Sequence, residues 1–360
     1  MMEWSDNITV SYLTNPTERW TGSDKLNSID FLKRLRLSRM ISLILIAIFT
    51  VLGNALVLIV TWKEKRLHQP NKYFIALLSV ADLLVGLFLA PFFAYQFDLG
   101  YTSSDRDNMS IHLCRFMVWM DVFALTTSIY SLTFISFDRY LKISKPLLYK
   151  SRMTTSRSIK IIFAIVLIST VFATYSATPY SGSTGILATG SGLCTWTLGF
   201  MIKSPIFYLF LTISTFFSPA VIIIIMYARI FHVVHKRNKM LMNGKLGETI
   251  DNQNQRTALL RDMKVIRMLL VVVGVFLLCW GPLFTWILIY FYHKNQRIIF
   301  SRIKYGTHVF LNIAETLPLF NSLCNPIIYV CLDQTYREAF KKLFRRMMRR
   351  PDARRQPPIA

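Results

Sequence analysis

The stretch that decides the fold is CRFMVWMDVFALTTSIYSLTFISFDRYLKISKPLLY, residues 114–149. Most of it is apolar enough to lie in lipid, yet Asp121 stands near its start and Asp138-Arg139 near its end. A carboxylate inside a membrane span is costly unless it faces a cavity or a partner. Each of these two acids is therefore a candidate functional residue.

One helical face of this stretch joins its two charged ends. Its members recur at steps of three or four residues, which is the helical period: Asp121, Leu125, Ser128, Leu132, Ile135 and Arg139. The face runs from an acid near one membrane surface to an arginine near the other. We expect this helix to connect a site on one side of a membrane with a partner on the other.

The rest of the chain has the same character. It has 360 residues, 53% of them hydrophobic, and its charges lie mainly between long apolar segments. Seven such segments can each cover the ~20 residues that a bilayer core requires: 40–62, 73–96, 112–140, 158–180, 205–231, 265–291 and 306–331. The sequence therefore predicts an all-α membrane protein with seven spans over 40–331, after a polar tail over 1–39.

The basic residues predict the orientation. If the N-terminus is extracellular, the inside carries 29 Lys and Arg and the outside 13, in agreement with the positive-inside rule. Four cations on the expected outer side are exceptions to the positive-inside rule that the sequence does not explain: Lys33, Arg34, Arg36 and Arg39. The cations cluster beside apolar spans without any nucleic-acid motif, so we expect no nucleic-acid partner.

The outer flanks carry covalent-modification candidates. Cys114 and Cys194 both fall on the expected outer side, so we expect a disulfide between them and an oxidising, extracellular face. Asn7 and Asn108 begin N-x-Ser/Thr acceptors for glycosylation.

Three segments are expected on the inner side of the membrane: a loop, an amphipathic helix and a tail. Residues 232–263 read as a polar, flexible loop, and the pair His232 and His235 lacks a nearby third metal ligand. Residues 332–348 have one apolar face among cations, which predicts an amphipathic helix on the anionic inner leaflet. Residues 349–360 read as a disordered cytoplasmic tail.

Motifs on six of the spans resemble one known family. In chain order they are Gly53-Asn54, LSVADLL around Asp82, Asp138-Arg139-Tyr140, Pro219 with Tyr227, FLLCWGP from Phe276 to Pro282, and NSLCNPIIY from Asn321 to Tyr329. Together they resemble a rhodopsin-like G-protein-coupled receptor over about residues 38–348. The stretch FISFDRYLKISKPLLY is most similar to the biogenic-amine receptor group.

The resemblance implies roles for three sets of residues. A sodium ion would be held by Asp82, Ser128, Asn321, Ser322 and Asn325. Switching and G-protein coupling would involve Ile129, Asp138, Arg139, Tyr140, Leu147, Pro219, Tyr227, Asp262, Phe276, Pro326 and Tyr329. The ligand would lie among Asp121, Val122, Leu125, Thr212, Thr215, Trp280, Leu283, Phe284, Ile287, Glu315 and Leu319.

Asp121 decides the expected ligand class. It stands where amine receptors of this family carry the aspartate that binds a protonated amine, and a buried carboxylate and an ammonium compensate one another's desolvation. Leu319 departs from the tyrosine usual in amine receptors, and a basic peptide is the alternative ligand. Glu315 is a second acid, which either faces the second charge of a dication or pairs with Arg115 or an outer-loop lysine.

The sequence thus predicts a plasma-membrane receptor, not an enzyme, that takes an extracellular cationic ligand and activates a heterotrimeric G protein. Arrestin, a receptor kinase and membrane lipid are the further partners that the resemblance implies, with sodium as an allosteric ion and no other cofactor. A transporter of organic cations is the alternative from another class, although the chain shows no internal repeat with paired broken helices.

Overall fold

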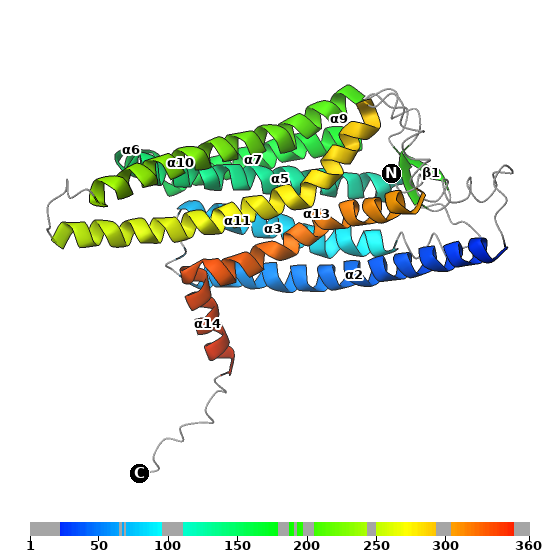
Figure 1. The fold of residues 1–360 in the computed structure, drawn as a ribbon, viewed down its shortest axis with the longest axis horizontal. Coiled ribbons are helices and arrows are strands. Elements are labelled where there is room, and N and C mark those ends of the chain that lie inside the picture. Colours follow the sequence, from blue (N-terminus) through cyan, green and yellow to red (C-terminus); the bar gives the residue numbers. More distant parts are fainter. Residues whose placement is uncertain are drawn as a thin grey trace, which may run out of the picture.

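The computed structural model describes residues 22–64, 67, 70–95, 111–178, 187–190, 193–196, 205–242, 250–292 and 304–348. Long helices lie side by side over most of this length (Figure 1). They are α2 (Gly22–Lys63), α3 (Pro70–Leu84), α5 (Ile111–Ser144), α7 (Thr155–Ala177), α10 (Ser218–Met242), α11 (Ile250–Tyr292) and α13 (Lys304–Leu332). The prediction of an all-α bundle is confirmed.

Two spans contain a short π-helical segment. The segment η2 (Val85–Leu89) continues α3, and η3 (Ile213–Phe217) joins α9 (Pro205–Thr212) to α10. Single π turns inside helices are rare and occur often at functional sites, because the added residue rotates the side chains that follow it. In η3 the two buried side chains are those of Thr215 and Phe216.

The helix α5 lies at the centre of the bundle. It contacts α3, α7, α10 and α11, whereas α2 and α13 pack against one another beside it. Gly53 permits that second contact, since a Cβ there would lie 3.0 Å from the side chain of Pro326. The residues that decide the fold from sequence therefore form the middle of the structure.

Six helices in the described residues are long and apolar enough to cross a membrane. The remaining long helix, α13, contains the polar residues Asn312, Glu315, Asn321 and Asn325. Large apolar side chains such as Phe163 and Leu278 are 69% and 74% exposed, as expected of surfaces that face lipid.

Three helices begin or end beyond the predicted limits. The helix α2 begins at Gly22, so residues 22–39 are helical and continuous with the first span. The predicted loop over 232–263 is mostly helical, because α10 ends at Met242 and α11 begins at Ile250. The predicted limits followed the apolar runs, whereas the helical hydrogen bonds continue through polar residues once a long span has nucleated the helix.

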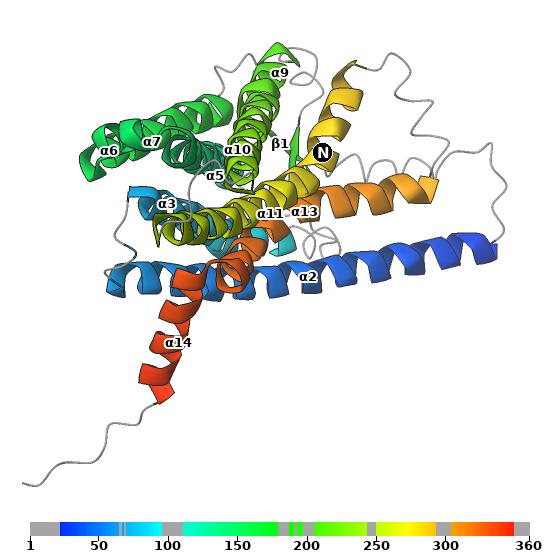
Figure 2. The ribbon, with the colours of Figure 1, turned by 60° about the vertical axis from the view of Figure 1, so that its left-hand side comes forward.

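A β-hairpin and two short helices mark opposite ends of the bundle (Figures 1 and 2). The strands β1 (Leu187–Gly190) and β2 (Leu193–Trp196) are antiparallel, and β1 contacts α5. At the other end are α6 (Pro146–Arg152) and α14 (Gln334–Met348), which turns away from the bundle. The helical part of the amphipathic prediction is confirmed by α14, and the hairpin is a feature that the sequence did not predict.

Candidate functional site

Asp121 lies where three packed clusters meet in the half of the bundle that contains the hairpin. Met120 packs in a cluster formed with α2, η2 and α13, whereas Val122 packs against α7 and α9. Leu125, one turn farther inward, belongs to the main core. Within the described part of the chain, the partly buried Asp121 carboxylate has neither a hydrogen bond nor an ion pair. This acid is therefore available to a partner from outside the chain.

Stacked aromatic rings continue inward from this level. Phe284 stacks on Phe216 at a ring-centroid distance of 4.6 Å, and Trp280 stands 5.7 Å from Phe284. Phe276, 6.2 Å from Trp280, is fully buried in the same core as Ile129. The structure thus joins predicted ligand residues to predicted switch residues. Phe216, which is buried in η3, was not predicted as part of this set.

The two threonines of the fifth span are deeply buried. The Thr215 hydroxyl donates to the Leu211 carbonyl oxygen at 2.7 Å, which uses its only proton within the helix. Thr212 is also buried. Leu283 and Ile287 are partly buried on α11, and Ile287 packs against the main core. Apolar and aromatic side chains thus provide most of the surroundings expected for the ligand.

Glu315 forms an ion pair with a residue of α2. Arg39 Nη2 lies 2.8 Å from Glu315 Oε2, and Arg39 Nη1 donates to Asn312 Oδ1 at 2.6 Å. Arg39 is buried, and it joins α2 to α13 through Glu315, which lies 276 residues later in the sequence. The ion pair thus accounts for one of the cations before the first span, and the proposed pairing with Arg115 or an outer-loop lysine is corrected.

A buried polar cluster lies deeper in the bundle. Asn325 Nδ2 donates to Asp82 Oδ2 at 2.7 Å, whereas Asp82 Oδ1 and Asn321 Oδ1 have no hydrogen-bond partner. Ser128 of α5 and Ser322 of α13 are also buried. Buried oxygen atoms without donors are costly in an apolar interior, so this set has the chemistry to hold a small hard cation.

The predicted coupling residues lie near the end that carries α6. Arg139 is buried, and its Nε lies 3.9 Å from Asp138 Oδ2 of the same helix. Burial, followed by the charge of Asp138, raises the pKa of Tyr149 in α6 to about 12, so this phenol remains protonated at neutral pH. Arg139 and Asp138 thus form one polar centre with α6.

The other coupling candidates are placed as follows. Tyr227 is buried, and its hydroxyl accepts from Ser136 Oγ at 3.5 Å. Tyr140 is partly buried and Leu147 is 87% exposed. Pro219 and Pro326 are buried within α10 and α13. Asp262 lies in α11, but its side chain is outside the described residues, so its pairing with Arg139 stays a prediction.

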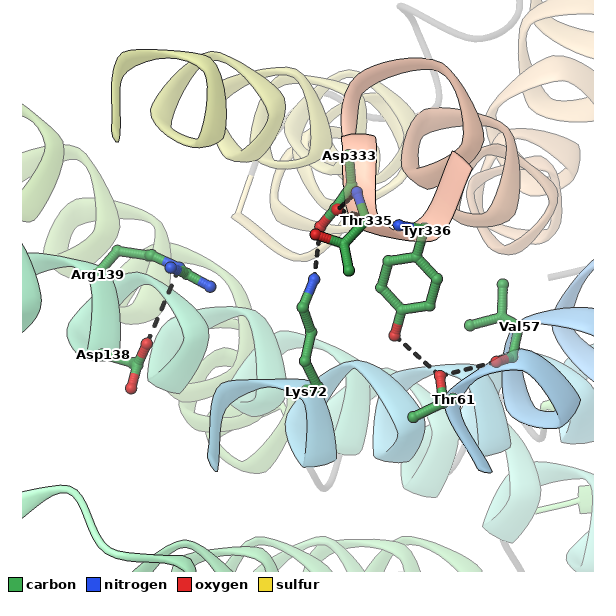
Figure 3. A network of polar contacts seen from close by, with 8 residues as sticks. All are labelled: Val57, Thr61, Lys72, Asp138, Arg139, Asp333, Thr335 and Tyr336. Atoms are coloured by element: carbon green, nitrogen blue, oxygen red, sulfur yellow. Dashed lines mark hydrogen bonds and ion pairs between the residues drawn. The ribbon is translucent and has the colours of Figure 1, made fainter. Parts of the chain in front are cut away.

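A second polar network at this end was not predicted (Figure 3). Lys72 of α3 pairs with Asp333, and Lys72 Nζ stands 4.5 Å from the ring centroid of Tyr336. Asp333 Oδ1 also accepts from the backbone N–H of Thr335 at 2.9 Å, so it caps the start of α14. The Tyr336 hydroxyl reaches Thr61 of α2 at 2.9 Å.

This network brings three parts of the chain together. Tyr336 is fully buried and stacks on Tyr329 at 5.7 Å, although it lies on a helix that turns away from the bundle. The only sequence signal for it was the apolar face of 332–348. Through Tyr336 and Asp333, the start of α14 is held against both α2 and α3.

The covalent candidates lie largely outside the described part. Cys114 is buried and disulfide-bonded, whereas Cys279, Cys324 and Cys331 are free thiols. The side chain of Cys194 in β2 is outside the described residues, as are Asn7 and Asn108.

Comparisons with known proteins identify the family. The model of the 7 transmembrane receptor (rhodopsin family) matches residues 53–329. The alpha-1A adrenergic receptor of Rattus norvegicus is 29% identical over 326 residues, which are 83% of this chain and 66% of that receptor. The adenosine receptor A2b of Mus musculus is 29% identical over 315 residues, 84% of this chain and 88% of that receptor.

The chain therefore spans slightly less than two thirds of the length of the adrenergic receptors that it matches. The family match covers most of the chain, and it includes the first-span glycine, the buried acid of the second span and the last tyrosine of α13. With its helical bundle, this match shows that the chain is a multi-pass membrane protein of the rhodopsin family of seven-transmembrane receptors.

Proposed function

We propose that this protein is a plasma-membrane receptor for an extracellular cationic amine and that it activates a heterotrimeric G protein. The observation that carries the proposal is the Asp121 carboxylate, which is partly buried and has no partner among the described residues. An ammonium group would compensate its desolvation. The adrenergic receptors among the relatives support this ligand class, whereas the adenosine receptor shows that similarity alone does not select it.

The aromatic rings provide the route from ligand to switch. A ligand paired with Asp121 and packed on Phe284 and Trp280 changes the contacts of Phe276, which lies in one core with Ile129. The ligand shifts the equilibrium only by its difference in affinity between the two states. In the active state the end of α11 near α6 moves outward, and the G protein contacts Arg139, Tyr140 and Leu147.

The remaining partners follow from this orientation. The N-terminus, the hairpin and a Cys114–Cys194 disulfide are extracellular, which is supported by the bonded state of Cys114 and by the contact of β1 with α5. The cationic face of α14 lies on anionic lipid, and arrestin and a receptor kinase bind the same inner side.

Sodium is the proposed allosteric ion. Asp82, Asn321, Ser128, Ser322 and Asn325 would hold it, and the unpartnered oxygen atoms of the first two supply the supporting observation. The ion stabilises the inactive state through its charge interaction with Asp82.

The test of the amine proposal is Asp121→Asn, assayed by G-protein dissociation over a panel of arylalkyl monoamines. An ammonium left without a counter-ion costs about 3–5 kcal/mol, which corresponds to a loss of potency of at least about a hundredfold. Surface expression of wild type and variant is matched by labelling an N-terminal epitope. If Asp121→Asn keeps its full response to the best monoamine, the amine proposal is wrong and a basic peptide becomes the candidate ligand.

A further inference from the structure

The two acids in the outer half of the bundle differ in their charge balance. Asp121 has no partner in the described part of the chain, whereas Glu315 is neutralised by Arg39 at 2.8 Å. The side chains of Arg39 and Glu315 are only 7% and 16% exposed, so water screens their interaction little. The outer half thus offers a single uncompensated negative charge among these residues.

The Arg39–Glu315 pair lies directly outward of the cluster that flanks Asp121. Leu319 is one turn inward of Glu315 on α13, and Leu43 is one turn inward of Arg39 on α2. Both leucines pack in one cluster with Met120, the neighbour of Asp121. Since four helical residues rise about 6 Å, the ion pair stands roughly one turn outside this cluster. A ligand that is anchored on Asp121 and extends outward toward α2 and α13 would meet this pair.

We propose that Arg39 is a specificity-determining residue that restricts this receptor to ligands with one positive charge. This inference rests on the proposed amine function. A second ammonium near Glu315 meets a guanidinium that already occupies the carboxylate, so it would be desolvated without gaining a counter-ion. A neutral or aromatic far end carries no such cost.

A role in selectivity and a purely structural role predict different effects when the ion pair is removed. If the ion pair only joins α2 to α13, its loss lowers the stability and the response to all amines alike. If it sets selectivity, removing the positive charge of Arg39 leaves Glu315 negative, and the receptor gains a second cation site. The gain must then depend on Glu315.

The experiment compares two probes that differ by one charge: phenethylamine and the same molecule with an aminomethyl group at the far side of the ring. The readout is G-protein dissociation, expressed as the ratio of diamine to monoamine potency. We expect Arg39→Gln to raise this ratio at least about tenfold over wild type. Arg39→Lys keeps the charge and leaves the ratio near that of wild type, while Arg39→Gln combined with Glu315→Gln abolishes the gain.

The outcomes distinguish the two proposals. An unchanged ratio in an expressed Arg39→Gln receptor that still responds to phenethylamine overturns the selectivity role alone. If Arg39→Gln is not expressed, Arg39→Met serves in its place, because it also removes the charge and keeps the apolar stem. If wild type is silent toward both probes and toward the wider monoamine panel, the amine function is overturned, and this inference with it.

Discussion

Asp82 shows how a single buried residue depends on its neighbours. Asn325 satisfies one of its carboxylate oxygens, and the other has no hydrogen-bond donor. In an apolar interior such an acid needs either a proton or a cation. Asn321 Oδ1 also lacks a donor, and a bound cation is the kind of partner that satisfies several such oxygen atoms at once.

We therefore expect Asp82→Asn to abolish the sodium dependence of agonist affinity while leaving expression largely intact. The amide replaces the charge that attracts the ion and keeps nearly the same volume. Agonist affinity is measured by competition binding in sodium and in a bulky organic cation at equal ionic strength. A variant with the wild-type sodium dependence would place the cation elsewhere.

At the scale of the element, α14 is held by interactions that its own sequence does not contain. Its amphipathic face explains why it is a helix beside a membrane, but Asp333, Lys72 and Thr61 determine where it begins and what it touches (Figure 3). The ion pair is nearly inaccessible to water, with 8% and 9% of the two side chains exposed. Breaking such a pair lowers the stability of the fold, because it leaves a buried charge without a counter-ion.

We expect Lys72→Gln to lower the stability of the purified receptor by about 3 kcal/mol, since Asp333 is left without its counter-ion. The matched control is Lys342→Gln, which breaks the pair with Glu64. Because the Lys342 side chain is 54% exposed, its loss should cost under about 1 kcal/mol. Thermal inactivation curves in detergent compare the two variants. Equal shifts would contradict the structural role of the Lys72–Asp333 pair.

Asp333→Asn separates the ion pair from the helix cap. The amide oxygen still accepts from the N–H groups of Thr335 and Tyr336, so the start of α14 stays capped while the charge is lost. Its inactivation curve should therefore resemble that of Lys72→Gln.

At the scale of the whole molecule, the two ends of the bundle are closed by different charge pairs. Arg39 and Glu315 join α2 to α13 near the hairpin, and Lys72 with Asp333 joins α3 to the start of α14 at the other end. Between them the core consists mainly of apolar and aromatic side chains. Prolines within α11 and α13 remove backbone hydrogen bonds there, which allows one end of a helix to move while the other stays packed.

Movement of α11 leads to a prediction about ligand-free signalling. If Asp262 restrains Arg139 in the inactive state, Asp262→Ala removes the restraint and raises basal nucleotide exchange on the G protein. Basal exchange is measured at matched surface expression, with Lys342→Gln as a control for a charge change elsewhere on the inner side. Unchanged basal exchange would count against a restraining pair.

The features of the fold that depend on local sequence patterns were predicted from the sequence. The long apolar spans, the position of Asp121 on the central helix and the place of each motif depend on apolar runs and on the helical period, which a linear pattern contains. The ends of α2, α10 and α11 were predicted poorly. Apolar runs indicate which residues lie within the bilayer, but they do not indicate where a helix begins or ends. The hairpin lies between two spans, where there is no apolar run from which to predict it.

Only the tertiary structure decided which charges are paired. Arg39 reaches Glu315 across 276 residues, and Lys72 reaches Asp333 across 261. Such contacts depend on how two helices rotate and tilt against each other, and on close approaches such as Gly53 to Pro326. A shift of one residue rotates a side chain by about 100° around its helix, so the sequence alone does not determine which acid keeps a free charge. For that physical reason the sequence left two roles open for Glu315, and only the structure shows that Arg39 neutralises it while Asp121 has no partner among the described residues.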